Sequence, residues 1–80
     1  MTLVTIYTRE GCHLCERMTA RVKELQRRYP FDLRETEIRE GDEHFDLYKD
    51  RIPVLMINGE FAFEYVLPED EFLRKLAVRA

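Results

Sequence analysis

Two cysteines, Cys12 and Cys15, lie three positions apart at the junction between a strand-like segment and a long amphipathic stretch. No other cysteine occurs among the 80 residues. Residues 3–7 are apolar and β-branched, which is typical of a central strand covered on both faces. Gly11 interrupts this strand, and helical periodicity begins at about Cys12. The chain must therefore turn sharply from a buried strand into a helix, with both thiols on the first turn of that helix.

A structural disulfide explains this pair poorly. A bond across so few residues removes little entropy from the unfolded chain and adds little stability. Residues 1–7 lack the basic region and long apolar run of a signal peptide, and no apolar run approaches the roughly 20 residues of a membrane helix. We therefore expect a cytoplasmic protein, where disulfides are mostly transient. Two packed core thiols are the remaining structural alternative.

The stretch after Cys12 predicts an amphipathic helix of about four to five turns. Pro30 should end it, because proline lacks an N–H and clashes with the preceding turn. Apolar residues recur every three or four positions and should form the buried face. They are Leu14, Met18, Val22, Leu25 and Tyr29.

Residues 31–38 predict a second strand, and their many charges suit an edge strand that must resist pairing with other chains. Asp42 is a suitable N-cap for a short helix over residues 45–48. Asn58-Gly59 separates two strand-like runs, 54–57 and 60–65, and indicates a tight hairpin turn.

Pro68 predicts the start of a last helix, followed by three acidic residues that favour the positive end of the helix dipole. Its buried stripe should contain Phe72, Leu73, Leu76 and Ala77. The whole order is β-α-β-α-β-β-α, in which the first two strands are parallel and the last two antiparallel. The predicted fold is a single α/β domain over residues 1–80, with a small mixed four-stranded sheet and helices on both faces.

Charge and composition exclude some classes of partner. The formal net charge is −3, and no block of Lys or Arg stands apart from acidic residues. Nucleic acid is therefore not an expected partner, because neutralising phosphates needs a concentrated basic surface. We expect no membrane partner and a monomer.

Residues Tyr7-Thr8-Arg9-Glu10-Gly11-Cys12-His13-Leu14-Cys15 resemble the active turn of glutaredoxin-like proteins of the thioredoxin-fold superfamily. Ile52-Pro53-Val54 resembles the cis-proline loop of that superfamily, and the Asn58-Gly59 hairpin follows at the family's spacing. The resemblance covers nearly all 80 residues and is closest to the short glutaredoxin-like branch of bacterial proteins. It implies a thioredoxin-like fold, thiol–disulfide oxidoreductase activity, and a substrate groove formed by Ile52, Pro53 and Arg9.

The chain departs from that family at the glutathione-binding positions. Glutaredoxins carry a small Gly-Gly pair and an Asp after the last strand, which hold the γ-glutamyl end of glutathione. The corresponding residues here are Phe63-Glu64-Tyr65-Val66-Leu67, which are bulky and acidic. We therefore expect no required cofactor and weak dependence on glutathione, which stays open as a ligand or electron donor. The other expected donor is an enzyme resembling thioredoxin reductase, and the substrate is a disulfide in a protein or small molecule.

Thiol–disulfide exchange requires a thiolate, and an ordinary cysteine is mostly protonated at neutral pH. The N–H groups and dipole at a helix N-terminus should lower the pKa of the Cys12 thiol. Arg9 can add a positive charge, as can His13 when it is protonated. Our hypothesis is that Cys12 attacks the substrate and Cys15, one turn deeper, resolves the mixed disulfide. General frequencies favour a trans bond before Pro53, whereas the resemblance implies cis.

Simpler roles compete with several of these assignments. Arg9 can be a solvated turn residue, and His13 and His44 are expected to face solvent. The aromatic residues Phe61, Phe63 and Tyr65 are expected to pack in the core and sheet.

Three functional classes remain open. The first is a dithiol oxidoreductase, and the second is a binding module with the same fold and no catalysis. The third is metal or iron–sulfur binding, although no metal is expected because zinc needs four ligands and only His13 stands beside the two thiols.

Overall fold

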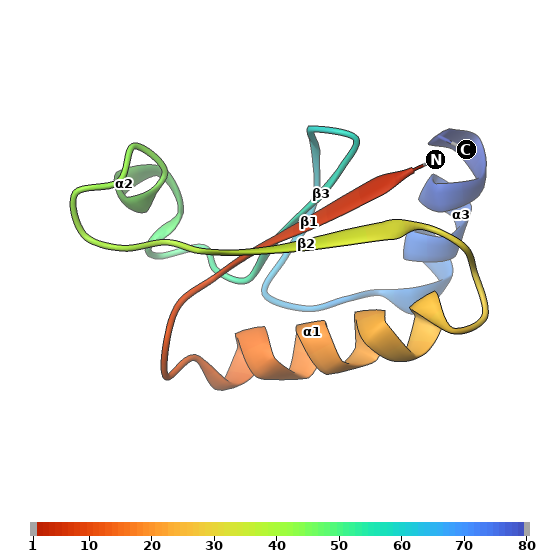
Figure 1. Ribbon diagram of the computed structural model, residues 1–80, viewed down its shortest axis with the longest axis horizontal. Coiled ribbons are helices and arrows are strands. Elements are labelled where there is room, and N and C mark those ends of the chain that lie inside the picture. Colours follow the sequence, from red (N-terminus) through yellow and green to blue (C-terminus); the bar gives the residue numbers. More distant parts are fainter. Residues whose placement is uncertain (1, 80) are drawn as a thin grey trace.

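The computed structural model describes the backbone of residues 2–79 and the side chains of residues 2–77. In this part of the chain the elements are β1 (Leu3–Thr8), α1 (His13–Gln26), β2 (Asp32–Glu37), α2 (Phe45–Tyr48), β3 (Val54–Ile57), β4 (Glu60–Glu64) and α3 (Glu69–Arg79). They form one four-stranded sheet in the order β2-β1-β3-β4, with the helices around it (Figure 1). The predicted order of elements and the mixed α/β fold are confirmed.

Strand pairing brings three loops to one end of the sheet. β1 pairs in parallel with β2 and antiparallel with β3, while β3 pairs antiparallel with β4. Near the end of β1, Tyr7 lies opposite Val54, and Val54 lies opposite Glu64. The segments that follow β1, precede β3 and follow β4 are therefore neighbours. β1 is central and β2 is an edge strand, as the apolar and charged patterns predicted.

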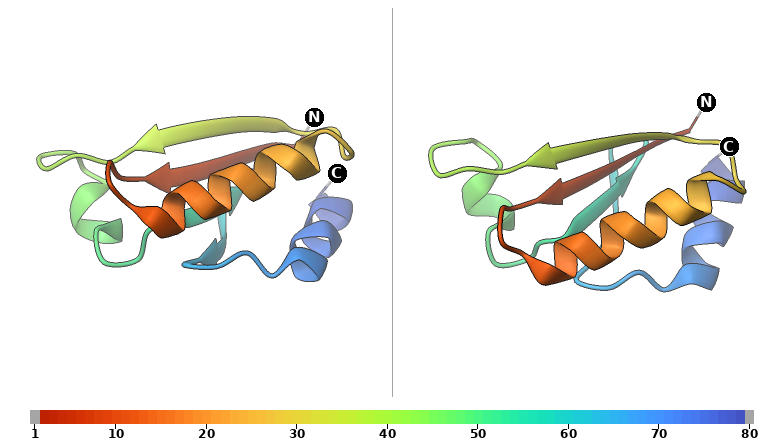
Figure 2. Two further views of the ribbon diagram at one scale, coloured as in Figure 1. Left: turned by 90° about the horizontal axis from the view of Figure 1, so that it is seen from below. Right: turned by 60° about the horizontal axis from the view of Figure 1, so that its bottom comes forward.

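Helices α1 and α3 cover the same face of the sheet. Both views in Figure 2 show α1 running along this face, with α3 near its C-terminal end. Arg21 of α1 joins Glu69 of α3 through a bidentate ion pair, with Nη2–Oε1 at 2.7 Å. Beneath the helices, the fully buried Phe72 meets Phe31 edge to face, with ring centroids 5.9 Å apart. This core holds α1 firmly, so the first turn of α1 has a fixed position relative to the sheet.

The buried face of α1 differs from the prediction at both ends. Cys15, Met18, Val22 and Leu25 are buried, whereas Leu14 is 42% and Tyr29 40% exposed. Leu14 is one residue, or about 100°, away from the buried line that starts at Cys15. Tyr29 lies beyond the helix, which ends at Gln26 rather than at Pro30. The residue before a proline disfavours helical geometry, so the chain leaves the helix before it reaches Pro30.

The ends of α2 and α3 also differ from the prediction. Asp42 does not cap α2: its carboxylate accepts the N–H of Arg39 at 2.9 Å, and His44 holds the N-cap position without a side-chain bond. Asp42 therefore stabilises the preceding turn. In α3, Pro68 stands one residue before the helix and its carbonyl accepts the N–H of Phe72. Ala77 is exposed and does not belong to the buried stripe.

The expected aromatic stripe on β4 is divided by an irregularity in the sheet. The register of β3 and β4 shifts between Leu55 and Met56, so that Ala62 and Phe63 are both buried. Such a bulge places one extra residue on one strand and reverses the side-chain alternation. Phe61 is consequently 46% exposed. Tyr65 lies beyond the end of β4 and is 43% exposed, so only Phe63 packs in the core as predicted.

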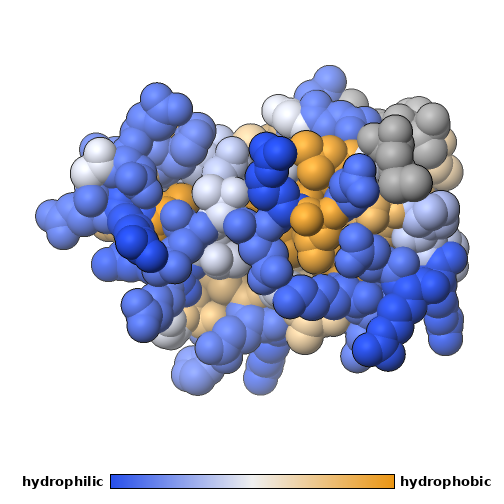
Figure 3. All heavy atoms as spheres, viewed as in Figure 1, coloured by the Kyte–Doolittle hydropathy of each residue, from blue (hydrophilic) through white to orange (hydrophobic). Residues whose placement is uncertain are grey.

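One face of the molecule is mostly hydrophilic (Figure 3). Figure 3 shows polar and charged residues over most of one face, with apolar residues gathered in a band near the strands. No helix among the described residues has the length and apolar character needed to cross a membrane.

Candidate functional site

The turn between β1 and α1 places Cys12 at the helix N-cap. Gly11 has φ +79°, a left-handed conformation that residues with a side chain rarely adopt. The N–H of Cys12 donates to the carbonyl of Arg9 at 3.3 Å, which closes the turn. Cys12 itself is extended, with φ −93° and ψ 107°, and its carbonyl accepts the first helical bond, from the N–H of Glu16. Local backbone geometry therefore fixes where the first thiol lies.

Cys12 and Cys15 are joined by a disulfide, with their Cα atoms 5.2 Å apart. The Sγ atom of Cys12 accepts the backbone N–H of Cys15 at 3.1 Å. Cys15 is only 2% exposed, whereas Cys12 is half-buried. Because the two residues differ in exposure, a partner can approach Cys12 more easily than Cys15.

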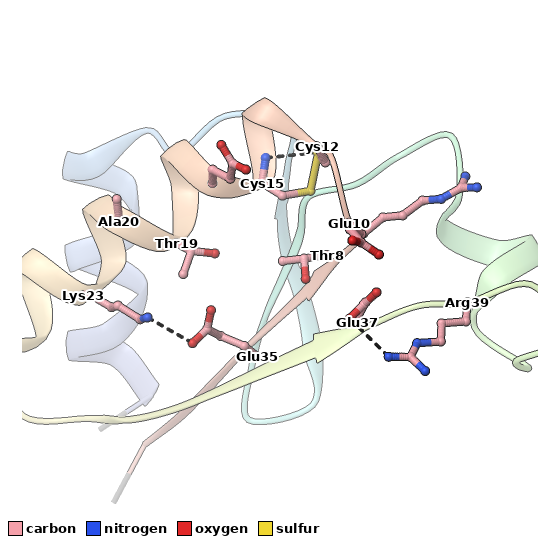
Figure 4. A pocket seen from close by; sticks show the side chains of 12 residues that line it. Thr8, Glu10, Cys12, Cys15, Thr19, Ala20, Lys23, Glu35, Glu37 and Arg39 are labelled. Atoms are coloured by element: carbon pink, nitrogen blue, oxygen red, sulfur yellow. Dashed lines mark hydrogen bonds and ion pairs between the residues drawn. A yellow bond between two sulfur atoms is a disulfide. The ribbon is translucent and has the colours of Figure 1, made fainter.

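An open groove of about 710 Å³ adjoins the disulfide and runs between α1 and the edge strand β2. Figure 4 shows Cys12 and Cys15 at one end, with Thr8 and Thr19 between the helix and the sheet. Charged pairs form its walls: Lys23 Nζ lies 3.3 Å from Glu35, and Arg39 lies 3.5 Å from Glu37. The lining residues are Thr8, Arg9, Glu10, Cys12, Cys15, Glu16, Thr19, Ala20, Lys23, Glu35, Glu37 and Arg39.

Arg9 lines this groove, but its guanidinium stacks over the ring of Phe45 with Cζ 5.1 Å from the centroid. Its role toward a substrate stays a prediction. The side chain of His13 is 93% exposed, as expected for a surface histidine, and Nδ1 lies 3.6 Å from Glu16.

His44 does not simply face solvent as expected. Its ring packs beside two tyrosines that stack on each other, 5.1 Å from the Tyr7 centroid and 5.9 Å from that of Tyr48. Its Nδ1 is buried without a hydrogen-bond partner. The acidic residues around His44 gave no indication of this packing, because Tyr7 is distant in the sequence.

Ile52 and Pro53 lie at the same end of the sheet as the disulfide turn, immediately before the start of β3. The bond between them is cis, the state that the resemblance implies. The N–H of Ile52 already donates to the carbonyl of Tyr48 at 3.0 Å. While this bond is intact, the backbone of a substrate beside Ile52 can therefore bond directly only to the Ile52 carbonyl.

The loop after β4 completes this end of the sheet, and the sequence did not identify its key residue. Tyr65 has φ +67°, and its N–H donates to the carbonyl of Pro53 at 2.9 Å. Beside it, Arg51 Nε donates to the Glu64 carboxylate at 2.8 Å. This bond to Glu64 raises the pKa of the Arg51 guanidinium above its ordinary value. No glycine or asparagine marked a left-handed turn at this position, so no local signal was present.

Comparison with known proteins identifies the family. A sequence model of the glutaredoxin-like domain (DUF836) matches residues 3–77. The chain belongs to this glutaredoxin-like family. No functionally curated protein gave a significant match.

Solved structures agree with the assignment to the glutaredoxin-like family. Protein Ne2328 from Nitrosomonas europaea is 38% identical, with a TM-score of 0.79, and the match covers 92% of this chain and 89% of that one. Protein XcR50 from X. campestris is 21% identical, with a TM-score of 0.72 and coverage of 94% and 96%. Oxidized thioredoxin O2 from Arabidopsis thaliana is 21% identical, with a TM-score of 0.61 and coverage of 98% and 72%. The two more distant similarities establish the thioredoxin-like fold alone.

Across the described part of this glutaredoxin-like chain, no group of three or more His, Cys, Asp or Glu side chains could hold a metal ion. The donor set beside Cys12 therefore does not fit a tetrahedral zinc site, which needs four ligands. Its chemistry is that of a C-x-x-C pair close enough to form a disulfide, which suggests a redox role.

Proposed function

We propose that this glutaredoxin-like protein is a thiol–disulfide oxidoreductase whose reactive groups are Cys12 and Cys15. In the reduced protein, the Cys12 thiolate attacks a substrate disulfide and forms a mixed disulfide, releasing one substrate sulfur as a thiolate. Cys15 loses its proton and attacks the sulfur of Cys12. This step releases the second substrate thiol and forms the Cys12–Cys15 disulfide. Two electrons pass from the protein to the substrate, and a thiol donor must restore the dithiol.

The observation that carries this proposal is the unequal environment of the two sulfurs. Cys12 is half-buried at the N-cap of α1, where its Sγ already accepts the N–H of Cys15. A thiolate at this position gains from that N–H and from the positive end of the helix dipole. Cys15 is almost fully buried and within bonding distance, which suits a thiol that attacks only a neighbouring mixed disulfide.

The assignment of roles is tested by trapping. The reduced Cys15→Ser protein should form a stable mixed disulfide with a peptide disulfide, because no second thiol releases it. The reduced Cys12→Ser protein should form little, because its remaining thiol is buried. Intact mass spectrometry after acid quenching measures both products. Equal trapping by the two variants would show that the roles are assigned wrongly.

Turnover is tested separately, with the unaltered protein. Reduction of insulin disulfides should proceed when an enzyme resembling thioredoxin reductase is supplied as the electron donor, and glutathione, the other donor we propose, should support it only weakly. Equilibration with glutathione redox buffers then gives the reduction potential. A protein that folds normally but reduces no disulfide faster than free dithiothreitol does would be a binding module instead.

A further inference from the structure

Tyr65 has an unusual backbone conformation in the loop after β4. Its φ of +67° is in the left-handed region, where a bulky side chain is rare. The N–H of Val66 donates to the carbonyl of Glu64 at 2.8 Å, which makes Tyr65 the centre of a three-residue turn. With a positive φ this turn is rare and strained. Glycine would adopt it freely, so the chain keeps a tyrosine here at the expense of local stability.

Two hydrogen bonds hold this tyrosine against the loop that precedes β3. Its N–H donates to the carbonyl of Pro53 at 2.9 Å, and its phenol donates to the carbonyl of Asp50. The ring must therefore lie along residues 50–53. The residue is 43% exposed, so a ligand can reach it. A strained residue held at both ends in this way is more typical of functional sites than of ordinary loops.

The ring lies at the end of the sheet that carries the disulfide. The residue after Pro53, Val54, pairs with both Tyr7 and Glu64, so the turn before α1 and the Tyr65 loop flank the same two strands. Both views in Figure 2 place the segment between β4 and α3 beside the first turns of α1. Arg51 pairs with Glu64, so this loop offers a ligand the bulk of the Tyr65 ring rather than an unpaired carboxylate.

We propose that Tyr65 is a specificity-determining residue that disfavours small disulfides and favours disulfides carried in extended peptide segments. This inference rests on the proposed thiol–disulfide exchange. A small disulfide has to find all its contacts close to Cys12, and on the Pro53 side the tethered ring takes up space along residues 50–53. A peptide extends away from its cysteine and can use contacts beyond the ring. The strained turn is retained because it aims the ring across residues 50–53.

The test compares the rates at which two oxidants convert the reduced protein to its Cys12–Cys15 disulfide. Glutathione disulfide is the small oxidant, and a twelve-residue peptide with one internal disulfide is the extended one. Each reaction transfers two electrons from the protein dithiol and releases two thiols, and stopped-flow measurements over a range of oxidant concentrations separate binding from the chemical step. Tyr65→Gly removes the ring and suits the positive φ, while Tyr65→Phe keeps the ring and removes the bond to Asp50. Tyr29→Gly is the matched control, because Tyr29 is similarly exposed and lies beyond the far end of α1.

We expect the unaltered protein to prefer the peptide by at least tenfold in second-order rate constant. Tyr65→Gly should reduce this ratio about tenfold, mainly through tighter binding of glutathione disulfide, and Tyr65→Phe about threefold. Tyr29→Gly should leave the ratio unchanged. Tyr65→Asn, which also tolerates a positive φ, gives a second ring-free variant if glycine loosens the loop.

An unchanged ratio in both ring-free variants, with normal oxidation by the peptide, would overturn the role of Tyr65 and leave the proposed function intact. If neither oxidant reacts with the unaltered protein faster than with a free cysteine, the proposed function fails and this inference fails with it.

Discussion

Ionisation of Cys12 should make the stability of the reduced protein depend on pH, and two variants isolate this effect. Cys15→Ser leaves Cys12 as the only cysteine, and Cys12→Ser/Cys15→Ser removes both. Serine is a favourable N-cap residue, so both proteins keep an acceptor for the N–H at position 15. Neither can form an internal disulfide. The two variants therefore differ in a single group that can carry charge.

The magnitude follows from the contacts of the Cys12 sulfur. It accepts one backbone N–H at 3.1 Å at the start of a 14-residue helix. A hydrogen bond to a charged group contributes about 1.5–3 kcal/mol, and the helix dipole about 0.3–1 kcal/mol. Cys12 is only half-buried, so solvent screens its charge. We therefore expect these two contributions together to stabilise the folded thiolate by about 2 kcal/mol, near the lower end of their sum. We therefore expect folding to favour the thiolate of Cys12 in the reduced protein, so that the stabilisation is complete above the ordinary thiol pKa of about 8.5 and is lost as the pH falls through the folded-state pKa.

Urea unfolding from about pH 5 to about pH 9, with a phosphine reductant present, measures the effect. The free energy of unfolding of Cys15→Ser, relative to the double variant, should increase by about 2 kcal/mol over this range. Other titrating groups cancel in the comparison. A difference that stays constant within about 0.5 kcal/mol would show that the N-cap does not stabilise the thiolate, and the argument for Cys12 as the nucleophile would lose its physical basis.

Two further predictions concern the fold that holds the site. Phe72→Ala should lower the free energy of unfolding by about 3–5 kcal/mol, because Phe72 is fully buried against Phe31. Phe61→Ala, at a half-exposed position, should lower it by less than about 1 kcal/mol. Urea titration of both variants checks this, and similar losses would contradict the described core. Asn58→Ala should cost about 2 kcal/mol, because Asn58 has φ +51° and its side chain accepts the N–H of Leu3 at 2.9 Å. Asn58→Gly loses only the hydrogen bond to Leu3 and should lower the free energy of unfolding by about 1 kcal/mol. Equal losses of stability in the Asn58→Ala and Asn58→Gly variants would contradict this explanation.

Local signals explain why the order of elements could be predicted. The apolar spacing in α1, the charged residues of β2 and the Asn58-Gly59 turn each depend on neighbouring residues, and each appears in the structure. The position of the cysteine pair at a helix start could be predicted for the same reason, because it follows from the residues on either side of the pair. Such features need no knowledge of distant contacts.

The remaining features depend on contacts between distant segments. The bulge on β4 exposes Phe61, yet nothing in its own residues distinguishes it from a regular strand. His44 packs on Tyr7, which lies 37 positions earlier in the sequence. Tyr65 adopts its turn because Pro53 and Asp50 bind it, and both belong to another loop. The immediate surroundings of the disulfide are therefore harder to predict than the disulfide itself.

The hydrogen bond from Ile52 to Tyr48 affects where binding energy for a substrate can come from. α2 has only four residues, and the Tyr48 carbonyl accepts the N–H groups of both Arg51 and Ile52 just after it. A peptide that takes the Ile52 N–H has to displace this carbonyl, so one amide–carbonyl bond replaces another with little net gain. Affinity must then come from the Ile52 carbonyl, from side-chain contacts and from the mixed disulfide itself. Encounters between this protein and its substrates should consequently be brief until sulfur–sulfur exchange makes them covalent.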